Sequence, residues 1–228
     1  MMWGLPFLFG PSLLILLPAI ILAAYAQWKV HSTYARYAKI ESEHRVTARS
    51  VALRLLADSS IQDVTIEPSA RRLSDHYDPT RKILRLSAPE SSSIAAIGVA
   101  AHEAGHAIQH AHAYRPLALR TAIVPIARFG SQLAFPLFLV GLFARFQPLI
   151  TIGIAAFSAA VLFTLITLPV EFDASRRAVS ALRQAAVLSN EEIGAVKEVL
   201  FAAALTYVAA AAMAALQLLM LLSAGRRR

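Results

Sequence analysis

The residues Ala101-His102-Glu103-Ala104-Gly105-His106-Ala107 lie inside an apolar run over residues 90–112, which predicts a helix. In a helix, positions i and i+4 lie on one face, so His102 and His106 can both offer an imidazole nitrogen to one metal ion. Glu103 then lies beside an open coordination position, where a carboxylate can accept a proton from metal-bound water. The stretch predicts a catalytic zinc site; the competing interpretation is a helix whose two histidines only pack.

The composition of the chain is that of a membrane protein. Hydrophobic residues make up 57 % of its 228 residues and charged residues only 16 %, and the mean hydropathy is +0.56, outside the range of soluble domains. The absence of cysteine excludes disulfides and thiolate metal ligands. A helix needs roughly 20 apolar residues to cross a bilayer. Four apolar stretches predict membrane spans over residues 1–28, 122–144, 146–170 and 199–225.

Two of these spans have an alternative interpretation. Residues 1–28 contain small residues spaced as at a signal-peptide cleavage site, but no basic segment leads them, so we expect a retained anchor. In the second span only residues 129–144 are uncharged, with Arg128 and Arg145 at the two ends. A buried soluble helix is therefore its alternative. Both arginines can extend to the membrane interfaces, which favours a span.

A polar region, residues 29–120, separates the first two spans. In residues 30–56, apolar residues recur at helical spacing among charges, which suggests one or two amphipathic helices. We expect them to form a solvated, partly membrane-hugging connector with no catalytic role. β-Like segments follow at residues 64–66, 73–77 and 83–86, the last two around the turn sequence Asp78-Pro79-Thr80-Arg81. The pattern predicts a hairpin before the metal-binding helix, and a serine after Glu90 that caps this helix.

The predicted hairpin bears on catalysis in two ways. An exposed strand can hold a peptide substrate in extended form through main-chain hydrogen bonds. His76 and Tyr77 lie on its first strand, and either side chain can stabilise a tetrahedral oxyanion near the zinc. The alternative for both residues is a packing or turn-stabilising role.

A catalytic zinc usually has three protein ligands, so a third is needed. His112 follows His102 at the spacing of the metzincins, whose helix breaks at a glycine to bring the third histidine round. Gln109 stands at that glycine position, and a straight helix would carry His112 about 9 Å along the axis from His106. His110 is likewise too far along a straight helix.

Glu171 is the better candidate for the third ligand. It is the first charged residue after the third apolar run, and an ionisable group at the end of a span is a functional candidate. Two predicted spans separate it from His106, so the chain returns to the same side of the membrane. The alternative for Glu171 is an ordinary interfacial carboxylate paired with Arg176 or Arg177.

Besides the two histidines and Glu103, several longer stretches of the sequence are typical of one protein family. They are Leu73-Ser74-Asp75-His76-Tyr77-Asp78-Pro79, Leu86-Ser87, residues 99–109, Val124-Pro125, Gly130-Ser131, residues 168–178 and residues 203–210. Together these strings resemble the YugP-type neutral zinc metallopeptidases of bacterial membranes. That family is distantly similar to the membrane peptidases related to HtpX and the CAAX prenyl protease.

The resemblance implies both a fold and a site. The implied fold is mainly α and integral to the membrane, with about four transmembrane helices and a zincin-like catalytic region that contains a small β-hairpin. The implied site is that of a gluzincin endopeptidase with one catalytic Zn²⁺. Its ligands would be His102, His106 and Glu171, and Glu103 would be the general base.

The sequence departs from the related peptidases in one respect. Their third ligand lies in an E-x-x-x-D segment, whereas here the residue four positions after Glu171 is Ser175 and the acid is Asp173. The carboxylate that would orient a ligand histidine is thus not at its expected place. Arg176 and Arg177 follow directly and are further candidates to stabilise the transition state.

The predicted function is that of a membrane-bound, zinc-dependent endopeptidase that hydrolyses peptide bonds with zinc-activated water. The alternative is a catalytically silent membrane scaffold or adaptor that retains the metal site. The carboxylate of Glu103 argues against this alternative, because only turnover needs it. A metal transporter is a further alternative, although all seven histidines lie outside the four apolar stretches.

We expect six segments along the chain. They are an anchor at residues 1–28, a catalytic region at 29–120, a transmembrane hairpin at 121–170, a third-ligand helix and loop at 171–198, a last span at 199–225 and a basic tail at 226–228. The net charge of +8 comes largely from residues that flank the spans. Basic residues at these positions favour contact with anionic lipid and not with nucleic acid. The expected partners are therefore the lipid bilayer and a peptide or membrane-protein substrate. Basic residues between the first two spans favour a catalytic site that faces the cytoplasm, and the resemblance implies a multi-pass protein of the bacterial cytoplasmic (inner) membrane.

Overall fold

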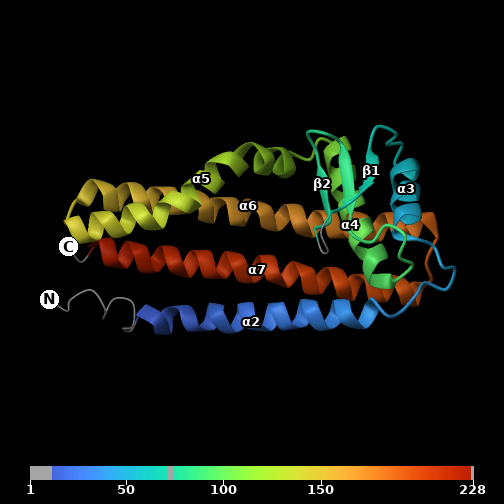
Figure 1. Ribbon diagram of the computed structural model, residues 1–228, viewed down its shortest axis with the longest axis horizontal. Helices are drawn as coiled ribbons and strands as arrows, with labels where there is room; N and C mark the ends of the chain where they lie inside the picture. Colours follow the sequence, from blue (N-terminus) through green and yellow to red (C-terminus); the bar gives the residue numbers. More distant parts are fainter. Residues whose placement is uncertain (1–11, 71–73, 227–228) are drawn as a thin grey trace. The chain divides into compact units, whose positions relative to one another are not determined.

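The computed structural model describes residues 12–70 and 74–226 of the chain, and helices predominate among them (Figure 1). In chain order the elements are α2 (Ser12–Tyr37), α3 (Ala48–Asp58), β1 (Thr65–Pro68), β2 (His76–Asp78), β3 (Ile83–Leu86), α4 (Ile94–Ala111), α5 (Arg115–Ala144), α6 (Gln147–Ala185) and α7 (Asn190–Arg226). The predicted combination of a mainly helical chain with a small β-structure is confirmed. Residues 1–11 of the predicted anchor, Leu73 of the predicted hairpin and residues 227–228 of the predicted tail lie outside the described residues.

Four of the described helices are long and apolar enough to cross a membrane, namely α2, α5, α6 and α7. Their most apolar windows have mean hydropathies from 1.4 to 2.4, as expected from the apolar stretches of the sequence. Helix α5 continues through Arg128 to Ala144, so the second predicted span is one uninterrupted helix. Helix α6 does not end with its apolar run but continues through Glu171 to Ala185.

The residues form two compact units according to their contacts. We call the first the helical unit; its described residues are 12–27, Leu119–Leu168 and 206–226. The second, which we call the mixed unit, comprises the described residues of Trp28–Ala118 and Pro169–Leu205. In the helical unit, α5 and α6 lie so close that a Cβ added to Gly153 would be 2.7 Å from the backbone nitrogen of Phe138. Only glycine permits this approach.

The mixed unit contains a three-stranded sheet in the order β1-β3-β2. Strands β2 and β3 are antiparallel, with Tyr77 opposite Leu84, and β1 lies parallel to β3. The predicted hairpin is confirmed, and its turn is held by Asp78, whose Oδ1 accepts the backbone N–H groups of Thr80 at 2.9 Å and Arg81 at 3.1 Å. Strand β2 is consequently an edge strand of this sheet, and it contacts α4.

Helices α3 and α4 pack against each other in the core of the mixed unit. One face of α3 is buried there, including Val51, Leu55 and Leu56. The amphipathic helix expected in this stretch is confirmed as α3, but the expectation of a solvated connector is wrong for it. Arg54 and Asp58 are exposed and form an ion pair with each other, whereas the apolar face of α3 packs against α4.

Candidate metal centre

Helix α4 begins as its sequence predicts. Ser93 is the N-cap, and its Oγ accepts the backbone N–H of Ala96 at 3.3 Å, which satisfies one of the free N–H groups of the first turn. Glu90, three residues before the N-cap, forms an ion pair with Arg49 at 2.9 Å. After the cap, alanine and isoleucine keep α4 buried along most of its length. The helix thus holds its two histidines in the interior of the mixed unit.

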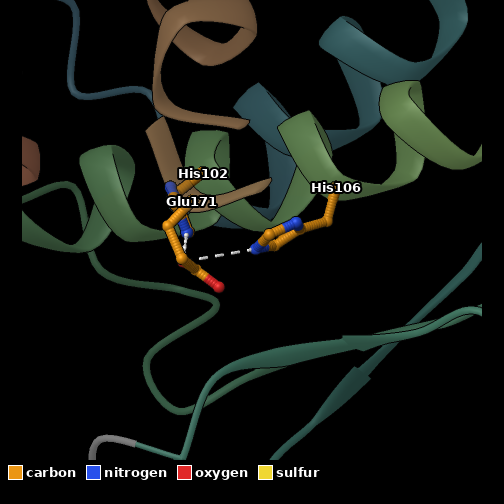
Figure 2. A group of neighbouring side chains, drawn as sticks. All are labelled: His102, His106 and Glu171. Atoms are coloured by element: carbon orange, nitrogen blue, oxygen red, sulfur yellow. Dashed lines mark hydrogen bonds and ion pairs between the residues drawn. The ribbon is translucent and has the colours of Figure 1, made fainter. Parts of the chain in front are cut away.

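His102 and His106 lie side by side on α4, with ring centroids 4.7 Å apart and ring planes at 81°. Figure 2 shows Glu171, from α6, pointing toward both imidazoles. Its Oε2 lies 3.1 Å from Nε2 of His102 and 3.7 Å from Nε2 of His106. The three donor atoms all lie within 4.8 Å of one another. Because Glu171 is only 2 % exposed and His106 7 % exposed, the group is largely shielded from water.

A glycine allows α4 and α6 to meet at this point. A Cβ added to Gly105 would lie 2.4 Å from the carbonyl oxygen of Ala174, a distance that no side-chain carbon can adopt. Ala174 and Ala178 on α6 are themselves fully buried. Small residues on both helices therefore bring Glu171 within reach of the histidines.

The donor set fits a zinc ion. Zinc binds imidazole nitrogen and carboxylate oxygen at about 2.0–2.2 Å in tetrahedral geometry, so two of its ligand atoms are about 3.4 Å apart. The separations of 3.1 and 3.7 Å from Glu171 to the two histidines lie on either side of this value. The three residues can hold one metal ion without moving far from their positions.

The charge around His106 favours its cationic form when no metal is bound. Burial by itself would lower the pKa of His106, but the hydrogen bond to Glu171 and the negative charges of Glu103 and Glu171 outweigh it, so the pKa lies above its ordinary value. Glu103 is itself buried, at 8 % exposure. The chain thus gathers two carboxylates around the histidines, a charge balance that suits a divalent cation.

Two residues that sequence reasoning did not assign to the site support the histidines. Oε1 of Gln109 lies 3.0 Å from Nδ1 of His106, and Oγ of Ser175 lies 3.1 Å from Nδ1 of His102. The available signal was helical spacing: Gln109 is three residues after His106, and Ser175 is four residues after Glu171.

The competing third ligands are engaged elsewhere. Nδ1 of His112 lies 2.8 Å from the carbonyl oxygen of Ile108, at the end of α4. Nδ1 of His110 lies 2.9 Å from the hydroxyl of Tyr77. Neither histidine belongs to the metal-binding group formed by the described residues.

The four candidates for transition-state stabilisation also have other contacts. The exposed ring of His76 lies 2.8 Å from the carbonyl oxygen of Ser74 and 3.2 Å from Arg85. Tyr77 contacts His110, and burial, with the charges of Asp63 and Asp78, raises its pKa to about 12. Arg176 and Arg177 both bind Asp173, at 3.3 and 2.5 Å. Asp173, not Glu171, is therefore the carboxylate that the arginines pair with.

Helices of spanning length and a buried donor set of two histidines and a glutamate are the features expected of a membrane metallopeptidase. The chain belongs to the family described as "Putative neutral zinc metallopeptidase", whose model matches residues 12–226. It is 47 % identical over 203 residues to the "Putative membrane protease YugP" of Bacillus subtilis (strain 168), a match that covers 88 % of this chain and 90 % of that protein. No solved structure matches the chain. The resemblance seen in the sequence is confirmed, and it supports a zinc-dependent hydrolase of membranes.

Proposed function

We propose that the protein is a multi-pass membrane endopeptidase that uses one zinc ion, bound by His102, His106 and Glu171. The observation that carries this proposal is the position of the Glu171 Oε2, which lies 3.1 and 3.7 Å from the two ligand nitrogens. It completes the usual number of protein ligands at a catalytic zinc and leaves one position for water or substrate.

The proposed hydrolysis assigns different roles to the metal ion, to Glu103 and to the three ligands. Bound zinc would supply an activated water and polarise the scissile carbonyl. Glu103, one residue after a ligand and buried, would accept the proton of that water and pass it to the leaving amine. Glu171 and the two histidines would hold the metal through Oε2 and the two Nε2 atoms, because Nδ1 of His102 faces Ser175 and Nδ1 of His106 faces Gln109.

The substrate is a peptide segment in extended form. Strand β2 is an edge of the sheet and contacts α4, the helix that carries both histidines. A substrate that pairs with β2 would extend the sheet by one strand beside this helix. Tyr77 ties β2 to α4 through its hydrogen bond to His110, so we assign it the role of fixing this strand near the site. Membrane proteins and peptides at the bilayer surface are the substrates that a membrane-bound enzyme encounters.

The test separates metal binding from catalysis. We expect Glu103→Gln to keep its zinc and to lose cleavage of casein or a membrane-protein substrate by about 10²–10⁴-fold, the usual contribution of a general base. Glu90→Gln, which changes a glutamate outside the site, serves as the matched control. Unchanged cleavage by Glu103→Gln would overturn the mechanism. A wild-type protein that binds zinc but cleaves nothing would instead be the silent scaffold.

We propose that the site faces the cytoplasm of a bacterial cell. Basic residues of the mixed unit outside the spans suit that side. Alkaline phosphatase fused after Arg145, which follows α5, tests the orientation, because a cytoplasmic site requires this junction to lie outside. An inactive fusion would reverse the assignment.

A further inference from the structure

We propose that each ligand histidine is oriented by its own uncharged support: His102 by the hydroxyl of Ser175, and His106 by the amide of Gln109, which links it to Asp173. This inference rests on the proposed metal site. It assigns positioning roles to three residues that do not touch the metal themselves, and it explains how the site works without a carboxylate four residues after Glu171.

The contacts of Gln109 determine which way its amide points. The residue is fully buried, at 0 % exposure, and its Nε2 donates to the carbonyl oxygen of Val170 at 2.8 Å and to Oδ2 of Asp173 at 2.9 Å. Both of these partners only accept hydrogen bonds. The reversed amide would place an oxygen against two acceptors. The Oε1 of Gln109 therefore faces His106.

This orientation fixes the tautomer of His106. An amide oxygen can only accept, so Nδ1 of His106 carries the hydrogen of the 3.0 Å contact with Gln109. Its Nε2 is then free of hydrogen in the neutral ring and can bind a metal, and this is the nitrogen that faces Glu171 at 3.7 Å. Gln109 thus leaves Nε2 as the nitrogen that can bind a metal, and it fixes the plane of the ring.

Asp173 holds the amide of Gln109 in place by accepting a hydrogen bond from its Nε2. The residue is 8 % exposed, and its carboxylate accepts from Gln109, from Arg177 at 2.5 Å and from Arg176 at 3.3 Å. Two guanidinium groups keep it charged and in place. The acid that lies two residues after Glu171 therefore acts on a ligand histidine through an intervening amide.

Ser175 plays the corresponding part for His102. It is four residues after Glu171, so both side chains project from the same face of α6. Its Oγ lies 3.1 Å from Nδ1 of His102 and can accept the hydrogen of that nitrogen. The Nε2 of His102 then faces Glu171 at 3.1 Å. One turn of α6 supplies both a ligand and the support of another ligand.

Removing such supports from metal sites typically weakens metal binding by about 10–100-fold. We expect Gln109→Met and Ser175→Ala each to weaken zinc binding by this factor, measured on the purified full-length protein by competition with a chromophoric chelator. Ser175→Thr retains the hydroxyl and should bind zinc like the wild type. Gln184→Met and Ser180→Ala change the same residue types elsewhere on α6, where Gln184 donates to Ser180 at 3.4 Å, and should have no effect.

Two further readouts separate positioning from a merely structural role. The metal-free Ser175→Ala protein should unfold at the same temperature as the metal-free wild type. The visible spectrum of the cobalt(II)-substituted variants should shift, because the spectrum reports ligand geometry. The inference is overturned if Gln109→Met or Ser175→Ala binds zinc within threefold of the wild type. It is also overturned if Ser175→Thr binds as weakly as Ser175→Ala.

The outcomes also distinguish this inference from the proposed function. Zinc affinity is measured without substrate, so a wild type that binds zinc but cleaves no peptide would refute the protease and leave the supports intact. Full zinc binding by Glu171→Ala would refute the ligand set, and the inference would fail with it.

Discussion

Gly105 on α4 lies against the carbonyl of Ala174 on α6, so close that a Cβ at this glycine would be 2.4 Å from the carbonyl oxygen. The contact sets the separation between the helix that carries the histidines and the helix that carries Glu171. Because backbone and not a flexible side chain stands opposite the glycine, a larger residue must push the two helices apart. The geometry of the donor group depends on this single missing side chain.

We therefore expect Gly105→Ala to lower both stability and zinc content. Overpacking of this kind typically costs about 1–3 kcal/mol, to be measured by thermal or denaturant unfolding in detergent. The matched control is Gly194→Ala on α7, where an added Cβ meets nothing within 4 Å; helix propensity predicts a gain of up to about 1 kcal/mol there. A Gly105→Ala protein with normal zinc content would show that the helices can separate without loss of the site.

The core position of α3 gives a second prediction. Leu55 is fully buried whereas Leu53, on the same helix, is 50 % exposed. Leu55→Ala should reduce the free energy of unfolding by about 2–5 kcal/mol. Leu53→Ala should change it by less than about 1 kcal/mol, because surface substitutions usually have little effect. Equal effects of the two substitutions would contradict the packing of α3 on α4.

A third prediction concerns the ligand set. Metal analysis of purified variants should find no bound zinc in Glu171→Ala and normal zinc in His112→Ala, because Nδ1 of His112 faces the carbonyl oxygen of Ile108 at 2.8 Å. Glu198→Ala, which removes a glutamate bonded to Tyr37, controls for the loss of a carboxylate. Loss of zinc in His112→Ala alone would identify that histidine as the third ligand.

Chelation gives a fourth prediction. Removal of zinc should abolish cleavage and lower the unfolding temperature, because a ligand bound only to the folded chain stabilises it by about 4 kcal/mol at a thousand times its Kd. Added zinc should restore both properties. In the double variant His102→Ala/His106→Ala, zinc should leave the unfolding temperature unchanged, and a rise there would point to binding elsewhere on the chain.

The fifth prediction concerns alkaline pH. Burial and the charges of Asp63 and Asp78 raise the pKa of Tyr77 from 10.0 to about 12. The unfolded chain loses the phenol proton first, so the stability from this residue is complete below pH 10 and declines as pH rises to about 12. The wild type should lose stability over this range, and Tyr77→Phe should lose less. Asp63→Asn should lower the pKa of Tyr77 in an absorbance titration; an unchanged value would contradict the assigned cause.

Local patterns in the sequence were sufficient for much of this fold. Helices of spanning length follow from apolar runs, the β2–β3 hairpin from its Asp78-Pro79 turn, and the histidine pair from helical spacing. Glu171 follows from the chain topology, because two spans between it and His106 return the chain to the same side of the membrane. These are inferences from near neighbours, or from the membrane as a boundary.

Two contacts of the residues that support the histidines join positions far apart in the chain. Gln109 and Asp173 are separated by 64 positions and Ser175 and His102 by 73, and no local pattern marks either pair. The apolar face of α3 was likewise visible in the sequence, but not the helix that covers it. The sequence shows Gln109 only as the residue at the glycine position of the metzincin spacing, whereas the structure shows its amide in contact with His106, Val170 and Asp173.

The separation of His102 from Glu171, 69 positions along the chain, has a consequence during biosynthesis. At roughly 5–20 residues per second, the ribosome adds Glu171 about 3–14 seconds after His102. Until then the nascent chain holds the two histidines but lacks the predicted third ligand. The proposed zinc site, and the cleavage proposed to depend on it, can therefore be complete only after this part of α6 has been made.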